Sequence, residues 1–214
     1  MPAPKIKICG ISTPAALDAC IAAQADYCGF VFFPPSPRNV TPSEAADLAA
    51  RAAGRIARVG LFVDADDLAI GEAIRAGSLD ALQLHGSEPP ERVAAVGSRF
   101  GLPVWKALPV SNAADVTRAL AYRGAADLVL FDARTPRGAL PGGMGLAFDW
   151  SLLAHWSGGI AWGLAGGLTP GNVAQAIAIT GAPLVDTSSG VESAPGIKDT
   201  GKIAAFCAAA RAGG

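Results

Sequence analysis

Short apolar segments alternate with longer alanine-rich segments along the whole chain. Eight of the short segments have the length and composition of buried strands: residues 6–9, 27–32, 58–63, 81–84, 104–107, 128–132, 160–165 and 184–186. The segments between them carry apolar residues at helical spacing. A repeated strand-then-helix order is typical of proteins in which helices cover a parallel sheet.

Several predicted helices have clear starting signals. Thr13-Pro14 and Thr41-Pro42 each place a capping residue before a proline at the first helical position, and Thr169-Pro170 follows the same pattern. Pro89-Pro90-Glu91 is expected to open a further helix. These signals separate the predicted helices from the strands that precede them.

The number of strand–helix units predicts a barrel. Eight units in 214 residues indicate a single-domain (β/α)8 barrel over residues 1–214, near the lower size limit of that fold. A doubly wound open sheet is the alternative, but it more often has one dominant phosphate-binding loop after its first strand. Here the glycine-rich turns follow the seventh and eighth predicted strands, where barrels bind phosphate. No linker or low-complexity tract divides the chain.

Composition narrows the class of protein. The net charge is −1 and the isoelectric point about 6.1, which gives no support to a nucleic-acid partner. No apolar run is long enough to cross a bilayer, and Met1-Pro2-Ala3-Pro4-Lys5 lacks the pattern of a signal peptide. Four cysteines without Cys-x-x-Cys spacing and only two histidines disfavour a zinc site. We therefore expect a cytoplasmic protein with reduced thiols and no membrane association.

Two turns rich in small residues are candidates for a phosphate site. Gly166-Gly167-Leu168-Thr169-Pro170 follows the seventh predicted strand, and Ser188-Ser189-Gly190 follows the eighth. Closely spaced backbone N–H groups and small hydroxyls can bind phosphate there without a lysine. Each turn alone is equally typical of ordinary helix capping. Both together, at the last two strand ends of a barrel, favour phosphate binding.

Cys9 and Asp132 are the candidate acid–base groups. Each ends a predicted strand, at the end of a barrel where catalytic side chains lie. Lys7 shares one side of the first strand with Cys9, so its ammonium is expected to depress the thiol pKa if the groups come close. The alternatives are an aspartate that caps the next turn and an inert buried thiol, which we expect for Cys20, Cys28 and Cys207. The glycine-rich segment 141–145 is a candidate lid.

Arg38 and His85 are candidate substrate ligands. Arg38 lies in a proline-stiffened loop after the second predicted strand, and its guanidinium suits a carboxylate or a phosphate. His85 follows the fourth predicted strand in the run Leu82-Gln83-Leu84-His85-Gly86. A solvated surface arginine and a hydrogen-bonded structural histidine are the respective alternatives.

Short motifs occur in a consistent order along nearly the whole chain. They are Lys7-Ile8-Cys9-Gly10-Ile11, Gly29-Phe30-Val31-Phe32 with Ser36-Pro37-Arg38, Leu82-Gln83-Leu84-His85-Gly86, Asp132 with its glycine-rich loop, Phe148-Asp149-Trp150, Ala165-Gly166-Gly167-Leu168-Thr169-Pro170-Gly171-Asn172-Val173, and Asp186-Thr187-Ser188-Ser189-Gly190-Val191-Glu192. Each motif is short, but their joint order and spacing are specific. In these motifs the chain resembles the phosphoribosylanthranilate isomerases of tryptophan biosynthesis. Asn39, where an aromatic residue or histidine is common, and a glycine-rich loop lengthened by residues 137–140 are minor departures.

The resemblance implies a (β/α)8 barrel enzyme. Its reaction is the Amadori rearrangement of N-(5-phosphoribosyl)anthranilate to 1-(2-carboxyphenylamino)-1-deoxyribulose 5-phosphate, without metal or cofactor. The resemblance implies Cys9 as catalytic base, Asp132 as general acid and Arg38 as ligand of the anthranilate carboxylate. The other implied substrate-binding residues are Asp186, His85 and Lys7, and the implied phosphate-binding residues are Gly166, Gly167, Ser188, Ser189 and Gly190.

Other functions are separable from this one by residue type. The related barrel isomerase of histidine biosynthesis has an aspartate in place of Cys9 and needs two phosphate sites, and a dual-substrate isomerase is disfavoured on the same grounds. A non-catalytic sugar-phosphate-binding barrel would keep the turns but can lose Cys9 or Asp132. The expected partner is a small phosphorylated substrate. We expect a monomer, with a homodimer as the alternative.

Overall fold

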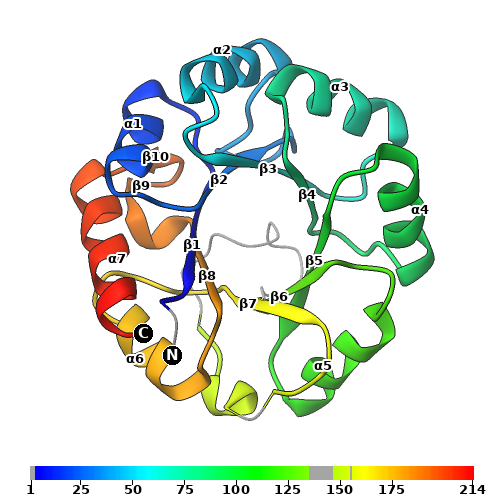
Figure 1. The fold of residues 1–214 in the computed structure, drawn as a ribbon, viewed down its shortest axis with the longest axis vertical. Coiled ribbons are helices and arrows are strands. Elements are labelled where there is room, and N and C mark those ends of the chain that lie inside the picture. The colour runs from blue at the N-terminus through cyan, green and yellow to red at the C-terminus, as the bar shows by residue number, and fades with distance from the viewer. Residues whose placement is uncertain (1–2, 135–146, 155) are drawn as a thin grey trace.

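Eight parallel strands form a closed barrel in sequence order. The computed structural model describes residues 3–134, 147–154 and 156–214. The last strand pairs with the first, which closes the ring seen in Figure 1. The strands are β1 (Lys5–Cys9), β2 (Tyr27–Val31), β3 (Ala57–Phe62), β4 (Ala81–Leu84), β5 (Val104–Val110), β6 (Leu128–Ala133), β7 (Ala161–Leu164) and β8 (Leu184–Thr187). The predicted (β/α)8 barrel is confirmed.

Helices surround the ring of strands (Figure 1). They are α1 (Pro14–Ala22), α2 (Pro42–Ala52), α3 (Asp67–Gly77), α4 (Pro90–Phe100), α5 (Ala113–Thr117), α6 (Val173–Thr180) and α7 (Thr200–Ala212), with the 3₁₀ helices η1 (Arg118–Tyr122), η2 (Trp150–Leu153) and η3 (Ser189–Val191). Between β6 and β7, the described residues form only η2. None of the helices in the described ranges is long and apolar enough to span a membrane.

Three of the four predicted helix starts are correct. The Thr13 hydroxyl accepts from Ala16 N, Thr41 forms a capping box with Glu44, and α4 begins at Pro90. The prediction at Thr169-Pro170 is wrong, because α6 begins at Val173.

The Asn172 side chain bonds back to the residues that precede α6. Its Oδ1 accepts from Thr169 N at 2.7 Å, and its Nδ2 donates to Gly167 O at 2.9 Å. Together with the bond from Asn172 N to Thr169 O at 3.2 Å, these bonds close the residues between β7 and α6 into a turn.

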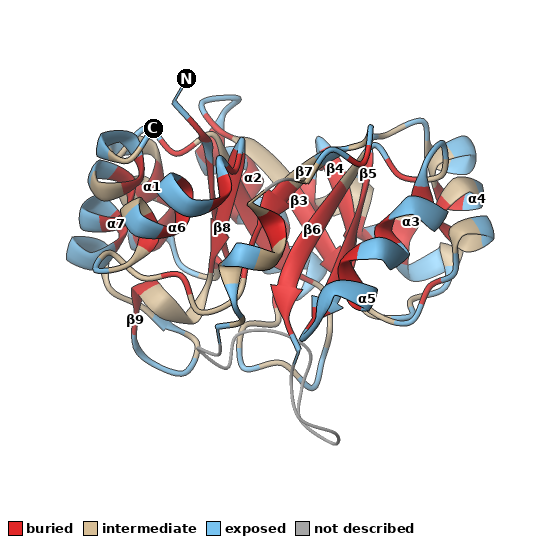
Figure 2. Cartoon of the chain, turned by 90° about the horizontal axis from the view of Figure 1, so that it is seen from below, coloured by how far each residue is buried: buried red, intermediate tan, exposed pale blue. Residues whose placement is uncertain are grey.

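Alternation along each strand separates two apolar regions. On β1, Ile6 and Ile8 point outward and belong to the core shared with the helices. Residues of the opposite face fill the barrel: one cluster contains Val59, Ala81, Trp105, Ala107, Leu130 and Leu184, and another contains Cys9, Val31 and Leu61. Figure 2 shows the resulting buried strands between half-exposed helices. The barrel is therefore a packed core that is polar only where the site lies.

The two ends of the barrel have different roles. Ion pairs join neighbouring strands at their amino ends: Lys5 with Asp26 at 2.7 Å and Arg58 with Asp80 at 2.9 Å. Figure 2 places both chain termini at this end and β9 at the other. The carboxyl ends of the strands, where barrel enzymes place their catalytic groups, lie at the opposite end of the barrel from these ion pairs.

Candidate active site

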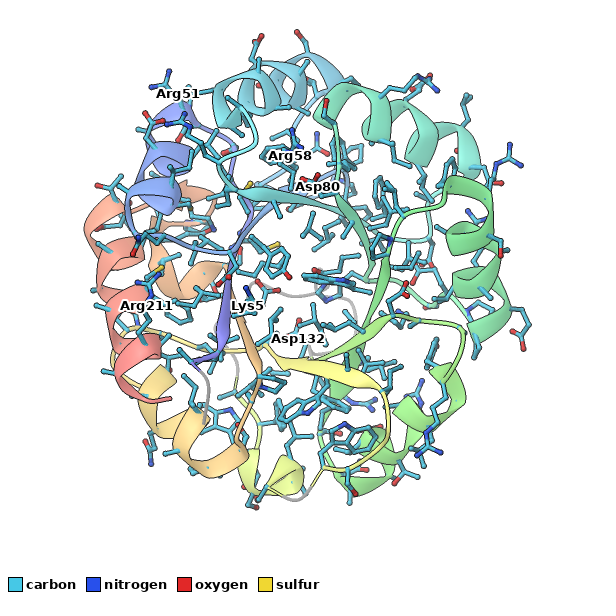
Figure 3. All side chains as sticks on the ribbon, viewed as in Figure 1. Lys5, Arg51, Arg58, Asp80, Asp132 and Arg211 are labelled. Carbon is cyan, nitrogen blue, oxygen red and sulfur yellow. The ribbon has the colours of Figure 1, made fainter. Side chains whose placement is uncertain are left out.

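The candidate residues converge at the carboxyl ends of the strands. Cys9 ends β1, Asp132 lies on β6, Asp186 lies on β8 and His85 directly follows β4. Figure 3 places Asp132 inside the ring of strands, whereas Arg51 and Arg211 lie on the helices outside. Residues far apart in sequence are thus brought to one barrel mouth, as their positions at strand ends predict.

Lys7 and Asp186 form a buried ion pair below that mouth. They are register neighbours on β1 and β8, with Nζ 2.9 Å from Oδ2. Burial alone would lower the pKa of Lys7. The negative charges of Asp186 and of the Cys9 sulfur have the larger combined effect, so the pKa of Lys7 is raised overall. Burial raises the pKa of Asp186 despite Lys7. Asp186 Oδ1 is buried and has no hydrogen-bond partner among the described residues, so its capacity to accept a hydrogen bond is unused there.

Burial governs the acidity of Cys9. It raises the thiol pKa, and a hydrogen bond and the positive charge of Lys7 oppose the rise without cancelling it. The expectation that Lys7 depresses this pKa is confirmed, because Lys7 lowers it, although burial outweighs that lowering and the pKa is raised overall. Cys20, Cys28 and Cys207 are fully buried free thiols, as expected. Burial raises the pKa of Cys28 to about 12 and that of Cys207 to about 11.

The glycine on the neighbouring strand makes room for this thiol. Gly29 pairs with Cys9 in the β1–β2 register. A Cβ at Gly29 would lie 2.9 Å from Cys9 Sγ and 3.1 Å from Cys9 Cα. The absence of a side chain at Gly29 therefore sets where the sulfur lies.

His85 contacts Asp132 across the barrel mouth. Nε2 of His85 lies 3.1 Å from Asp132 Oδ2, and both side chains are largely buried, at 15% and 11% exposure. Its Nδ1 lies 3.3 Å from Gln83 Nε2. When the Gln83 amide donates to Nδ1, the ring proton lies on Nε2 and faces the carboxylate. His85 is thus a partner of the candidate acid.

The two small-residue turns pack against each other. Thr187 Oγ1 donates to Leu168 O at 2.7 Å, and a Cβ at Gly190 would lie only 1.9 Å from that oxygen. Gly166 has φ +84°, and a Cβ there would lie 2.9 Å from Asp132 Oδ1. Both glycines are therefore required by protein contacts, in addition to any ligand.

Several backbone N–H groups of these turns are available for a ligand. Within the described ranges, no protein acceptor is bonded to the N–H groups of Gly166, Gly167, Ser188 and Ser189. All four residues are partly exposed. Clustered unpaired donors at adjacent strand ends are suited to an anion.

Arg38 reaches the same mouth from the loop after β2. Gly10 leaves room for it, because a Cβ at Gly10 would lie 2.7 Å from Arg38 Cδ and 3.1 Å from Ser188 Oγ. Nε and Nη2 of Arg38 each donate to Glu192 at 2.8 Å. This bidentate contact occupies the edge of the guanidinium formed by Nε and Nη2.

Sequence reasoning assigned no role to Glu192 or Lys198. Both lie on a hairpin of β9 (Glu192–Ala194) and β10 (Ile197–Lys198) that follows β8. The available signal was their position around Pro195-Gly196, since such a dipeptide marks a turn that can pair its flanks. The candidate lid, 141–145, lies outside the described residues.

Comparisons with known proteins agree on one family. Residues 6–209 match the family model described as N-(5'phosphoribosyl)anthranilate (PRA) isomerase. The N-(5'-phosphoribosyl)anthranilate isomerase of Paramagnetospirillum magneticum is 57% identical, and the match covers 98% of each chain.

Solved structures agree with the sequence matches. The phosphoribosyl anthranilate isomerase of Thermotoga maritima has a TM-score of 0.88 at 37% identity, covering 98% of this chain and 99% of that one. A phosphoribosyl anthranilate isomerase in complex with reduced 1-(o-carboxyphenylamino)-1-deoxyribulose 5-phosphate has a TM-score of 0.85 at 35% identity, with the same coverage. The chain therefore belongs to the N-(5'-phosphoribosyl)anthranilate isomerase family.

Proposed function

We propose that Cys9 and Asp132 are the base and the acid with which this tryptophan-pathway isomerase rearranges N-(5'-phosphoribosyl)anthranilate. One observation carries the assignment: a thiol and a carboxylate, on β1 and β6, end at the same barrel mouth. The thiol contacts a buried ammonium, and the carboxylate contacts an imidazole. An aldose-to-ketose rearrangement needs one proton delivered and one removed, which these two groups supply.

The chemistry begins at Asp132. Its carboxyl proton goes to the furanose ring oxygen, the ring C–O bond breaks, and an iminium forms at C1′. The Cys9 thiolate then removes the proton from C2′, which the iminium has acidified, and the resulting enolamine tautomerises to the ketone. The Nε2–H of His85 can donate to the Asp132 carboxylate once its proton has left. Lys7 contacts the sulfur and stabilises its thiolate form.

Substrate binding uses two anionic ends. The phosphate is assigned to the unpaired N–H groups of the turns after β7 and β8, which include Gly166, Gly167, Ser188 and Ser189, with Gly190 closing the second turn. The carboxylate is assigned to Arg38, and the unpartnered Oδ1 of Asp186 is assigned to a donor group of the substrate. The phosphate supplies remote binding energy that orients the sugar between acid and base.

The Cys9→Ala and Asp132→Asn variants test the proposal. Each should lower kcat by roughly 10²–10⁴-fold, the loss typical of a missing acid or base, as followed by the fluorescence of the anthranilate group. Cys207→Ala is the matched control, because it removes an equally buried thiol from α7 and should leave turnover unchanged. Near-wild-type turnover in either test variant, with folding confirmed by circular dichroism, would refute its role.

The remaining expectations concern assembly and location. A small phosphorylated substrate is the partner that this site would bind. The large exposed apolar side chains Leu68, Leu120, Ile179 and Ile197 lie on four different elements, which supports the expectation of a monomer. The monomeric state and the cytoplasmic location stay predictions.

A further inference from the structure

A buried ion pair follows the last barrel strand. Glu192 and Lys198 pair in the register of the β9–β10 hairpin, with Nζ 2.6 Å from Oε1. Their side chains are only 4% and 2% exposed. Lys198 Nζ also donates to Ser188 O at 3.0 Å and to Ser188 Oγ at 3.1 Å. The ammonium therefore holds one of the turns assigned to phosphate from behind.

The same carboxylate holds Arg38. Both Glu192 oxygens accept from the guanidinium at 2.8 Å, and Gly196 N donates to Oε2 at 3.2 Å. Burial alone would raise the pKa of Glu192. The hydrogen bonds and positive charges of Arg38 and Lys198 have the larger combined effect, so the pKa is lowered overall and the Glu192 carboxylate is ionised. The contacts form a continuous bridge from Arg38 through Glu192 and Lys198 to Ser188.

This bridge joins the two ends of the proposed substrate site. Two cations and one anion leave a net positive charge between the carboxylate end and the phosphate end, which offsets the repulsion between the two substrate anions. A ligand at either end also fixes side chains that the other end shares. Because the bridge is one series of buried charge-assisted hydrogen bonds, a change of position or charge at one end changes the contacts at the other.

We propose that Glu192 and Lys198 are positioning residues that couple recognition of the substrate carboxylate at Arg38 to recognition of its phosphate at Ser188. The inference rests on the proposed function of those two sites. Its consequence is specificity: a ligand with both anions is favoured by more than the sum of its two parts. A sugar phosphate or an anthranilate alone makes contact at only one of the two sites and does not benefit from the coupling.

Binding of four ligands measures the coupling. The first is reduced 1-(o-carboxyphenylamino)-1-deoxyribulose 5-phosphate, which carries both the carboxylate and the phosphate. The other three lack the carboxylate, the phosphate, or both. Calorimetric Kd values give a coupling factor. It is the increase in affinity that the carboxylate causes in ligands with the phosphate, divided by the increase that it causes in ligands without the phosphate. We expect a factor of about five or more in the wild-type protein.

Two variants break the bridge at different points. Lys198→Met removes the ammonium that reaches Ser188, and Glu192→Gln removes the shared negative charge. Both should bring the coupling factor close to one, and each is measured on folded protein. Lys106→Met is the control, since Lys106 and Glu88 form an equally buried pair at 3.0 Å whose contacts do not include Arg38 or Ser188. It should be destabilised but keep the wild-type factor.

The outcomes separate this inference from the function on which it rests. A wild-type factor of one, or the wild-type factor retained in both variants, overturns the coupling while the two sites stand. If removing the carboxylate or the phosphate leaves the affinity unchanged in wild-type protein, the proposed sites themselves are wrong, and the coupling with them. A factor lowered equally by Lys106→Met would also overturn it, because a general loss of rigidity would then suffice.

Discussion

Replacing Lys7 by Met tests how the first strand controls its thiol. Lys7 is fully buried, and methionine fills a similar volume without charge or donor. The substitution removes the hydrogen bond and the charge that lower the pKa of Cys9. Asp186 acts on Cys9 in the opposite direction and more weakly, so losing its partner does not reverse the effect. The pKa of Cys9 should therefore rise further, and its thiolate should become scarcer at neutral pH.

General energetics set the size of the effect. A hydrogen bond to a charged group is worth about 1.5–3 kcal/mol, and 1.36 kcal/mol corresponds to tenfold in a protonation equilibrium. Thiolate at neutral pH, and with it kcat/KM, should fall roughly 10- to 100-fold. Stability should fall by about 3–5 kcal/mol, because Asp186 is left buried without its cation. The double variant Lys7→Met with Asp186→Asn should recover part of that loss.

The assay is the pH dependence of Cys9 alkylation by iodoacetamide, located by mass spectrometry and compared with that of kcat/KM. Because the thiolate is the reactive form, both rates should rise with pH, and Lys7→Met should move both curves to higher pH. Lys5→Met is the matched control, since Lys5 is on the same face of β1 but is exposed and pairs with Asp26. If Lys7→Met left the curves in place or moved them to lower pH, the electrostatic argument would be refuted.

Three further substitutions have defined outcomes. Gly29→Ala should lower kcat about tenfold or more, because its Cβ would displace the Cys9 sulfur, and kinetics with anthranilate fluorescence will show this. Arg38→Ala should weaken anthranilate-bearing ligands about tenfold or more but barely change the Kd of inorganic phosphate alone; equal losses would place Arg38 at the phosphate. Gly190→Val should raise KM and lower Tm, because its side chain would collide with Leu168 O and separate the two turns. An unchanged Tm would contradict that packing.

The strands were predictable because burial on both faces leaves a simple pattern. Residues 81–84 were predicted as a strand, and β4 spans those residues. The segment 160–165 shortens to Ala161–Leu164, and the left-handed backbone of Gly166 and Gly167 ends the extended chain after it. The positions of Cys9 and Asp132 followed from the same pattern, since a polar residue that ends an apolar strand of a barrel lies at its mouth.

Interactions between segments distant in sequence were not predictable in the same way. The net direction of the Cys9 pKa shift depends on how far burial outweighs the ammonium groups of Lys7 and Lys198, and sequence spacing contains no measure of burial depth. Asn172 closes a turn where Thr169-Pro170 resembled a helix start, and its side chain bonds to the backbone of Thr169 and Gly167. The bridge from Arg38 to Lys198 joins the loop after β2 to the hairpin after β8.

One face of β1 shows how the fold and the site are built from the same residues. Lys5, Lys7 and Cys9 occupy alternate positions and point to one side. Lys5 forms an exposed ion pair, which contributes at most about 1 kcal/mol and can be replaced at little cost. Two residues further, the same residue type is fully buried, pairs with Asp186 and changes the acidity of a thiol. The same residue type therefore has different effects at different depths along one strand. The exposed lysine only stabilises the fold, whereas the buried lysine also changes the pKa of the Cys9 thiol, since a charge acts more strongly as water is excluded.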